Sequence, residues 1–456
     1  MQKANALQVF TIVARNYLPY ALVLGDSVLQ YHPDATFSIF LMDDLDHSLR
    51  SSIEARGFQP IFPEEIPLTE YRKLAFQYNI TEASTGVKPS VIQMLFDSGA
   101  KKVIYLDPDI LCFRRFDEVL AALDGCCIVL TPHICSPVPD DYYPGERALL
   151  NSGAFNLGFI ALRASETSTR FLRWWAEHLR RECVQEIESG LFVDQKWIDM
   201  VPACFDHVYI MRNLAYNIAY WNLHERALEE REGKLYEVQS GDRVAFIHFS
   251  GIVLDDLNSL CKYTARNPFG DGSCKQRYTL SSRPDLAATF MRYKQLLLAA
   301  DFESFSRLSY AYAAYDDGEP ISDLERSLYR TSESWRSKEV DPFRTGGGSF
   351  RDACRRAGVR TGMVRPIKRP PEVSHGKNRG YRRLIEFFLR CCLLVLGPQN
   401  YLQFAKYMRH QFLPSNHGFL LTDENQTSSG DSAELANLAP RYTPVLPNPS
   451  KIEKSL

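Results

Sequence analysis

No apolar run of about 18 residues occurs in this sequence, so no segment is predicted to span a bilayer. The eleven cysteines include no Cys-x-x-Cys pair, which argues against a zinc ribbon, and their scattered spacing does not indicate a disulfide framework. A formal net charge of −2 argues against a dedicated nucleic-acid-binding protein. The first apolar run lacks a small-residue cleavage site and predicts a strand, not a signal peptide. We therefore expect a cytoplasmic protein.

The composition that is present is typical of a globular protein, with 45% hydrophobic and 24% charged residues. A chain of 456 residues is too long for one small core, so we expect a large catalytic domain with appendages. The segment 341–380 carries ten Lys and Arg against three acids. Composition predicts a catalytic domain over 1–265, a helical extension packed on it over 266–340, a basic Gly/Pro linker over 341–380, amphipathic helices over 381–412 and a disordered tail over 413–456.

The first fifty residues alternate between strand and helix patterns. Leu7–Ala14 and Thr36–Met42 are apolar and rich in β-branched or aromatic residues, which predicts buried strands. Leu18–Tyr31 and Leu45–Arg56 show helical spacing of apolar residues. This order predicts an α/β fold with a Rossmann-like, mostly parallel sheet flanked by helices.

One later strand, beginning at Val103, ends on Asp107-Pro108-Asp109. Proline cannot donate to a strand ladder, so the strand has to end there, and ligands of open α/β sheets bind beyond such carboxyl ends. Two carboxylates held in this way suit Mg²⁺ or Mn²⁺ carrying a diphosphate. A solvated acidic turn is the alternative.

Further polar motifs follow in order. Asn151-Ser152-Gly153 precedes an apolar strand, Asp194-Gln195 precedes a short helix, and a strand from Val244 ends on His248 with Gly251 in the next turn. Asn16-Tyr17 comes directly after the first strand.

The order of these five motifs resembles retaining glycosyltransferases of the GT-A fold, in particular family 8. The resemblance spans roughly residues 7–251. It implies a metal held by Asp107, Asp109 and His248, and a sugar faced by Asn151, Asp194 and Gln195. It further implies contacts with the nucleotide sugar from Asn16, Tyr17, Asp107, Ser152, Gly153 and Gly251. We also expect Thr11 to lie near the nucleotide and Lys88 to reach a phosphate.

The family pattern continues after the histidine with a Lys-Pro-Trp that helps to hold the diphosphate. Here Ile252–Asp256 follows instead, so another cation is expected to serve, with Arg15, Lys88 and Lys262 as candidates. The stretch Asn213–Arg226 also resembles bacterial glycosyltransferase-like proteins, although the sequence assigns its polar residues no role.

Each site residue also has a plain structural interpretation. His248 could be a core histidine, Asp194 the N-cap of the following helix, and Asn151–Gly153 a turn. Tyr17 could be a core aromatic residue and Lys88 a solvated one. Aromatic residues such as Trp174, Trp175, Tyr310, Tyr312 and Tyr315 are expected in the core.

The sequence therefore predicts a metal-dependent enzyme that moves a hexose from a nucleotide diphosphate sugar to a glycan or lipid-linked acceptor, with retention taken from the resemblance. A sugar nucleotidyltransferase would need a Gly-rich basic loop after the first strand, which is absent. A catalytically silent scaffold is the other alternative. The basic segment and the apolar, Arg-flanked Tyr381–Leu396 could contact the cytoplasmic membrane face, or pack on protein.

Overall fold

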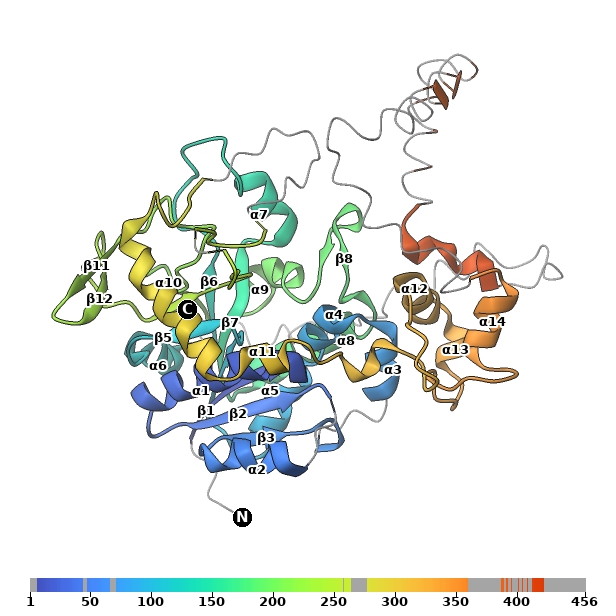
Figure 1. Cartoon of the computed structure of the whole chain (residues 1–456), viewed down its shortest axis with the longest axis horizontal. Helices are drawn as coiled ribbons and strands as arrows, with labels where there is room; N and C mark the ends of the chain where they lie inside the picture. The colour runs from blue at the N-terminus through green and yellow to red at the C-terminus, as the bar shows by residue number, and fades with distance from the viewer. Residues whose placement is uncertain are drawn as a thin grey trace, which may run out of the picture.

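A seven-stranded sheet forms the centre of the computed structural model, which describes residues 6–43, 47–65, 71–256, 258–263 and 277–359, together with parts of 387–421 (Figure 1). The strand order is β10-β6-β7-β4-β1-β2-β3. The strands are β1 (Leu7–Val13), β2 (Thr36–Leu41), β3 (Gln59–Ile61), β4 (Lys102–Leu106), β6 (Ile128–Pro132), β7 (Phe155–Arg163) and β10 (Val208–Ile210). Only β7 runs antiparallel to its neighbours in this sheet, so the predicted α/β fold with a mostly parallel sheet is confirmed.

Helices cover both faces of this sheet, which is why its strands are apolar throughout and not alternating. One face packs against α5 (Lys88–Asp97) and α8 (Glu166–Glu182), where Trp175 is fully buried. The other face packs against α1 (Leu18–Tyr31) and α6 (Asp117–Gly125). The two layers of helix leave the ends of the strands as the open part of the domain.

A second, two-stranded sheet lies beyond the carboxyl end of β4. It pairs β5 (Ile110–Cys112) with β13 (Phe246–His248) in antiparallel register. The sequence predicts the strand ending at His248 but not β5, because three residues are too few for a periodic signal. This small sheet joins the Asp-Pro-Asp turn to a segment about 140 residues later in the chain.

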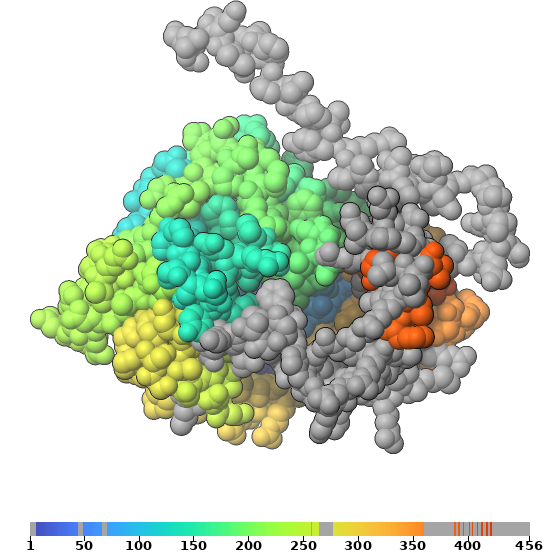
Figure 2. Space-filling view, turned by 90° about the horizontal axis from the view of Figure 1, so that it is seen from above, coloured from blue at the N-terminus to red at the C-terminus, as the bar shows by residue number. Residues whose placement is uncertain are grey.

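The C-terminal helical extension packs closely on the catalytic domain. Helix α10 (Pro284–Ala299) lies against α1, and Tyr293 stacks on Phe249 with ring centroids 4.0 Å apart. Helix α12 (Asp323–Thr331) lies against α3 (Tyr71–Gln77). Figure 2 shows the orange end of this extension on the side opposite the hairpin of β11 (Leu228–Arg231) and β12 (Lys234–Glu237), whereas the yellow α10 lies nearer to that hairpin.

The buried Arg326 ties the extension to the domain, since its guanidinium donates hydrogen bonds of 2.7–3.0 Å to the carbonyl oxygens of Ala75, Phe76 and Tyr78. The predicted core positions of Tyr312 and Tyr315 are also observed, because both are buried here.

The structure differs from the predicted linker at its beginning. Residues 341–359 are described, include α14 (Phe350–Arg356), and bury Phe343 and Phe350 against Phe76. Two aromatic side chains thus anchor a segment whose average composition is basic and polar. Residues 360–386, most of the predicted helices over 381–412, and 422–456 lie outside the described residues. None of the described helices combines the length and apolar composition needed to cross a membrane.

Candidate active site

The chain brings Asp107, Asp109 and His248 together through two adjacent ladders. Asp107 continues the pairing of β4 with β7, since its amide donates to Gly158 at 2.7 Å. Pro108 then turns the chain into the small sheet, where the carbonyl oxygen of Asp109 accepts from the amide of Phe249 at 2.8 Å. Because the register of β5 and β13 is fixed in this way, Asp109 and His248 are neighbours.

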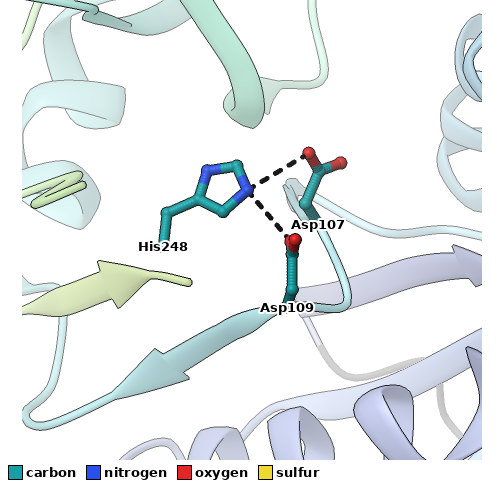
Figure 3. A group of neighbouring side chains, drawn as sticks. All are labelled: Asp107, Asp109 and His248. Atoms are coloured by element: carbon teal, nitrogen blue, oxygen red, sulfur yellow. Dashed lines mark ion pairs between the residues drawn. The ribbon is translucent and has the colours of Figure 1, made fainter. Parts of the chain in front are cut away.

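These three side chains form a compact cluster (Figure 3). Nε2 of His248 lies 2.9 Å from Oδ1 of Asp109 and 3.7 Å from Oδ2 of Asp107. One ligand atom from each residue lies within 4.8 Å of the others. The histidine side chain is only 3% exposed, whereas the Asp107 side chain is 29% exposed and can meet a ligand from solvent. Two carboxylates and one imidazole fit Mn²⁺ well, and Mg²⁺ less well because it prefers oxygen ligands.

The other ring nitrogen of His248 is held by Asn156, which the sequence did not indicate as a site residue. Nδ1 lies 3.2 Å from Oδ1 of Asn156, so it donates there and leaves Nε2 toward the carboxylates. Burial disfavours the charged ring, but the charges of Asp109 and Asp107 outweigh it and raise the pKa of His248. In the absence of a cation, the ring is therefore held as an ion-pair partner of Asp109.

Gly158 is the second contact that the sequence reading missed. A Cβ at this position would lie 2.5 Å from Cε1 and 2.7 Å from Nδ1 of His248. Its signal was a glycine inside an apolar strand, which marks a close approach to another group.

We expect Gly158→Ala to displace the His248 ring and to weaken Mn²⁺ binding about 10- to 100-fold, the usual effect of disturbing a ligand's support. Titration of free Mn²⁺ by electron paramagnetic resonance measures this. Gly125→Ala is the control, because a Cβ there would have no atom of the described residues within 4 Å apart from its own helix and chain neighbours. Unchanged Mn²⁺ affinity in Gly158→Ala would show that the ring position is not needed for binding.

Behind the cluster, Lys88 and Asp194 form a buried ion pair. Nζ of Lys88 lies 2.8 Å from Oδ2 of Asp194, 2.9 Å from the carbonyl oxygen of Leu157 and 3.9 Å from Oδ1 of Asp107. Both side chains of the pair are 2% exposed. Burial raises the pKa of Asp194 to about 6, although the Lys88 charge opposes the shift.

This pair differs from what the sequence predicts for both residues. Lys88 is neither solvated nor open to a diphosphate, because its ammonium group is enclosed. Asp194 is not an N-cap, since the following helix η4 (Lys196–Met200) has Gln195 at that position without a side-chain capping bond. The two side chains contact each other instead. No sequence pattern reveals this pair, because the two residues are far apart in the chain.

Gln195 and the Asn151–Gly153 segment lie side by side. The Gln195 amide group donates to the Ser152 carbonyl oxygen at 2.8 Å and accepts from the Leu157 amide at 2.9 Å. Asn151 is exposed at the end of α7 (Glu146–Ser152), a helix that the sequence did not predict. Gly153 ends that helix with φ of 115°, a conformation that favours glycine. Gln195 therefore fixes the backbone from Ser152 to Leu157.

The predicted nucleotide contacts lie at different depths. Thr11 is fully buried in β1, and Asn16 is half-buried in the helical turn η1 (Arg15–Tyr17) that follows. Tyr17 is 38% exposed and stacks on Tyr20 with centroids 4.8 Å apart. Burial, and next the charge of Asp109, raise the pKa of Tyr17 to about 12, so this ring belongs to the surroundings of the cluster.

Gly251 shapes the turn after His248. It has φ of 66°, and a Cβ there would lie 2.7 Å from the ring of Tyr263. The amide of Lys262 donates to the Gly251 carbonyl oxygen at 2.8 Å, and its side chain is exposed. The Arg15 side chain instead donates to the Ser309 carbonyl oxygen at 2.6 Å. Lys262 is therefore the candidate cation that is both exposed and adjacent to the turn of the cluster.

Comparison with known proteins bears on the class of enzyme. Residues 43–256 match a family model described as nucleotide-diphospho-sugar transferase. An uncharacterized protein of Bacillus subtilis (strain 168), YfnD, is 21% identical over 259 residues, which cover 56% of this chain and 81% of that protein. The family match confirms, for this part of the chain, the predicted class of enzyme, a nucleotide-diphospho-sugar transferase.

Two solved structures of glycosyltransferases align with the chain at low similarity. The galactosyltransferase LgtC, solved with donor and acceptor sugar analogs, is 17% identical with a TM-score of 0.38, covering 64% of this chain and 95% of that one. The glycosyltransferase GlyE of Streptococcus pneumoniae TIGR4 is 14% identical with a TM-score of 0.38, covering 70% and 72%.

Proposed function

We propose, from the match of residues 43–256 to nucleotide-diphospho-sugar transferases, that this chain is a metal-dependent glycosyltransferase. It moves a hexose from a nucleotide diphosphate sugar to a glycan or lipid-linked acceptor. The observation that carries this proposal is the cluster of Asp107, Asp109 and His248 at the open end of the sheet. A divalent cation bound there would neutralise the charge that develops on the leaving diphosphate.

The nucleotide is proposed to lie over η1, with Tyr17 stacked on the base and with Asn16 and the strand end at Thr11 beneath it. The exposure of Tyr17 and its place near Asp109 support this arrangement. We propose that the exposed Lys262 contacts the diphosphate. It would take the role that the family pattern gives to the lysine of its Lys-Pro-Trp motif, which this chain lacks. Gly251 supplies the backbone turn that lets the segment of Lys262 approach.

The sugar is proposed to lie toward Asn151–Gly153 and Asp194-Gln195. In the structure Asp194 and Gln195 are buried, so their part in the site is to fix Lys88 and the backbone of residues 152–157. The exposed amide of Asn151 is the group of this set that faces solvent. Retention of anomeric configuration and a cytoplasmic location, with membrane contact through 341–412, are further proposals that the resemblance and the basic composition support.

The function can be tested by thermal unfolding with a panel of nucleotides and nucleotide sugars, each with Mn²⁺ and with EDTA. A ligand at about 100 times its dissociation constant stabilises the folded state by about 2.7 kcal/mol. We expect one nucleotide family to raise the midpoint in Mn²⁺ and to lose most of that effect in EDTA. Transfer assays with the donor so identified follow, and the anomeric configuration of the product reports retention.

Absence of a shift with every nucleotide would contradict the donor site and favour the scaffold interpretation. A shift that is the same in Mn²⁺ and EDTA would contradict the metal dependence alone, because the nucleotide site would then be present without a role for the cluster.

A further inference from the structure

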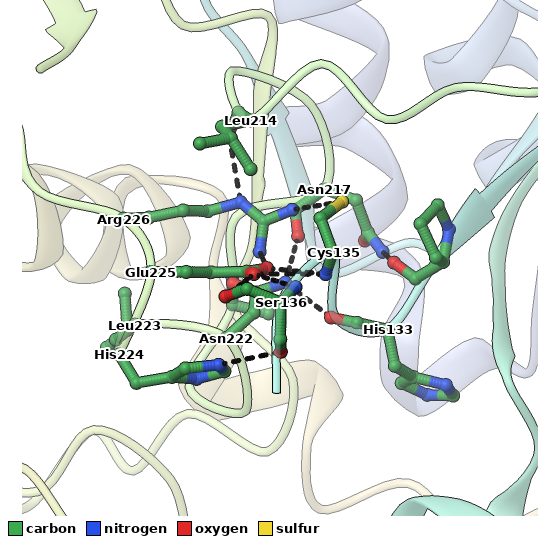
Figure 4. Close-up of polar contacts among 12 residues, drawn as sticks. His133, Cys135, Ser136, Leu214, Asn217, Asn222, Leu223, His224, Glu225 and Arg226 are labelled. Carbon is green, nitrogen blue, oxygen red and sulfur yellow. Dashed lines mark hydrogen bonds and ion pairs between the residues drawn. The ribbon is translucent and has the colours of Figure 1, made fainter. Parts of the chain in front are cut away.

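The segment Asn213–Arg226, to which the sequence assigns no role, forms a buried polar network (Figure 4). Its Trp221 ring lies against the His248 ring of the candidate metal cluster. Asn217 and Asn222 are fully buried and Arg226 is 3% exposed. Burying such groups costs free energy unless they are hydrogen-bonded, so their partners indicate what the segment holds in place.

Asn222 closes the turn 217–222 and ties it to the end of β6. Its Oδ1 accepts from the amide of Ala219 at 2.9 Å. Its Nδ2 donates to the carbonyl oxygens of Asn217 and His133, both at 2.9 Å. Both protons of the Asn222 side-chain amide thus go to backbone carbonyl oxygens. No other side chain of this size could donate and accept hydrogen bonds in the same way.

The same turn is joined to the strand that carries His248. Ile218 pairs with Ile247, and the amide of His248 donates to the Ile218 carbonyl oxygen at 2.8 Å. Trp221, 5% exposed, packs between two histidine rings. Its ring centroid is 5.4 Å from that of His133 and 5.3 Å from that of His248, at interplanar angles of 73° and 87°. The Trp221 indole therefore packs edge-on against the His248 ring and limits its movement on that side.

A second anchor secures the chain after His133. The Glu225 carboxylate accepts from the amides of Cys135 and Ser136 and from the Ser136 hydroxyl, at 2.6–3.0 Å. Arg226 donates to the same carboxylate at 2.7 Å. These charge-assisted bonds fix the backbone two residues after His133, whose ring nitrogen Nδ1 lies 2.8 Å from the carbonyl oxygen of Gly153.

We propose that Asn222 is a positioning residue for the metal cluster, acting through Trp221. By tying the turn to His133, it holds the indole against the His248 ring, so that the ring plane stays fixed and Nε2 stays directed at Asp109. Asn156 sets which nitrogen faces the carboxylates, and Trp221 sets the angle of the ring. This inference rests on the proposed function only where that function assigns a divalent cation to the cluster.

The test is Mn²⁺ affinity of the full chain without nucleotide, measured by electron paramagnetic resonance well below the unfolding midpoint. We expect Asn222→Ala and Trp221→Ala each to raise the dissociation constant about 10- to 100-fold, as for other supports of metal ligands. Trp221→Phe keeps a ring against His248 and should restore affinity to within a few-fold of the original chain. If Asn222 and Trp221 had a merely structural role, the alanine variants would have a lower unfolding midpoint, but Trp221→Phe would not restore Mn²⁺ affinity in this way.

Asn213→Ala is the matched control at the other end of the segment, where, within the described part of the chain, the side chain bonds only to Asp242 and to the Ala215 amide. It should leave Mn²⁺ affinity unchanged. If the original chain binds Mn²⁺ and Trp221→Ala binds it equally well, the positioning role is refuted while the proposed function stands. If the original chain binds no Mn²⁺, the metal site and the positioning role are refuted together.

Discussion

Asp109→Asn is expected to lower metal-dependent sugar transfer by about 10³-fold, which corresponds to about 4 kcal/mol of transition-state stabilisation. The substitution preserves shape but removes the charge that lies 2.9 Å from Nε2 of His248. An amide oxygen is a weaker ligand, and its NH₂ group can turn toward the imidazole. Mn²⁺ affinity should fall in parallel with activity, because the loss lies in the cluster and not in the fold.

The control for Asp109→Asn is Asp124→Asn on α6, whose side chain is 74% exposed and pairs with Lys102. It removes the same charge away from the cluster and should leave both activity and Mn²⁺ affinity unchanged. Unfolding of both variants in EDTA separates stability from binding. Full metal-dependent activity in Asp109→Asn would show that the cluster does not hold the catalytic cation.

The grouping of Asp107, Asp109 and His248 could be predicted from the sequence because its signals are local. An apolar strand that stops on Asp-Pro-Asp has to place its carboxylates at the sheet edge, and the strand before His248 ends at the same edge. The sequence did not reveal how the two meet. Strands β5 and β13 have three residues each, and their pairing depends on contacts far apart in the chain.

Residues that support the cluster escaped prediction for a related reason. Asn156 and Gly158 lie on β7, the strand inserted antiparallel between β6 and β4. Their place in the sheet brings them against His248. Their local sequence reads as an ordinary buried strand. Likewise, average composition described 341–359 as a linker, although Phe343 and Phe350 are enough to anchor it in the core. Averages over a segment hide the few side chains that decide its packing.

Lys88→Met is expected to destabilise the folded chain by about 3–5 kcal/mol, because it leaves Asp194 buried without its partner. Asp194 is 1% exposed and cannot recover hydration. The double variant Lys88→Met/Asp194→Leu should regain most of the loss, since an apolar pair needs no compensating charge. Chemical unfolding with urea measures the free energies, and a double-mutant cycle isolates the coupling.

The pH dependence of this destabilisation is the sharper measurement. The folded-state pKa of Asp194 is about 6, above its ordinary value of 3.8, so its contribution to stability falls as pH rises between these values and is constant above them. Without Lys88 the folded-state pKa moves higher still. In Lys88→Met the free energy of unfolding should then continue to fall above pH 6, by about 1.4 kcal/mol per pH unit. In the original chain it should not. In the double variant Lys88→Met/Asp194→Leu the extra slope should vanish. A deficit that is the same at pH 6 and pH 8 would show that Lys88 acts through packing and not through its charge on Asp194.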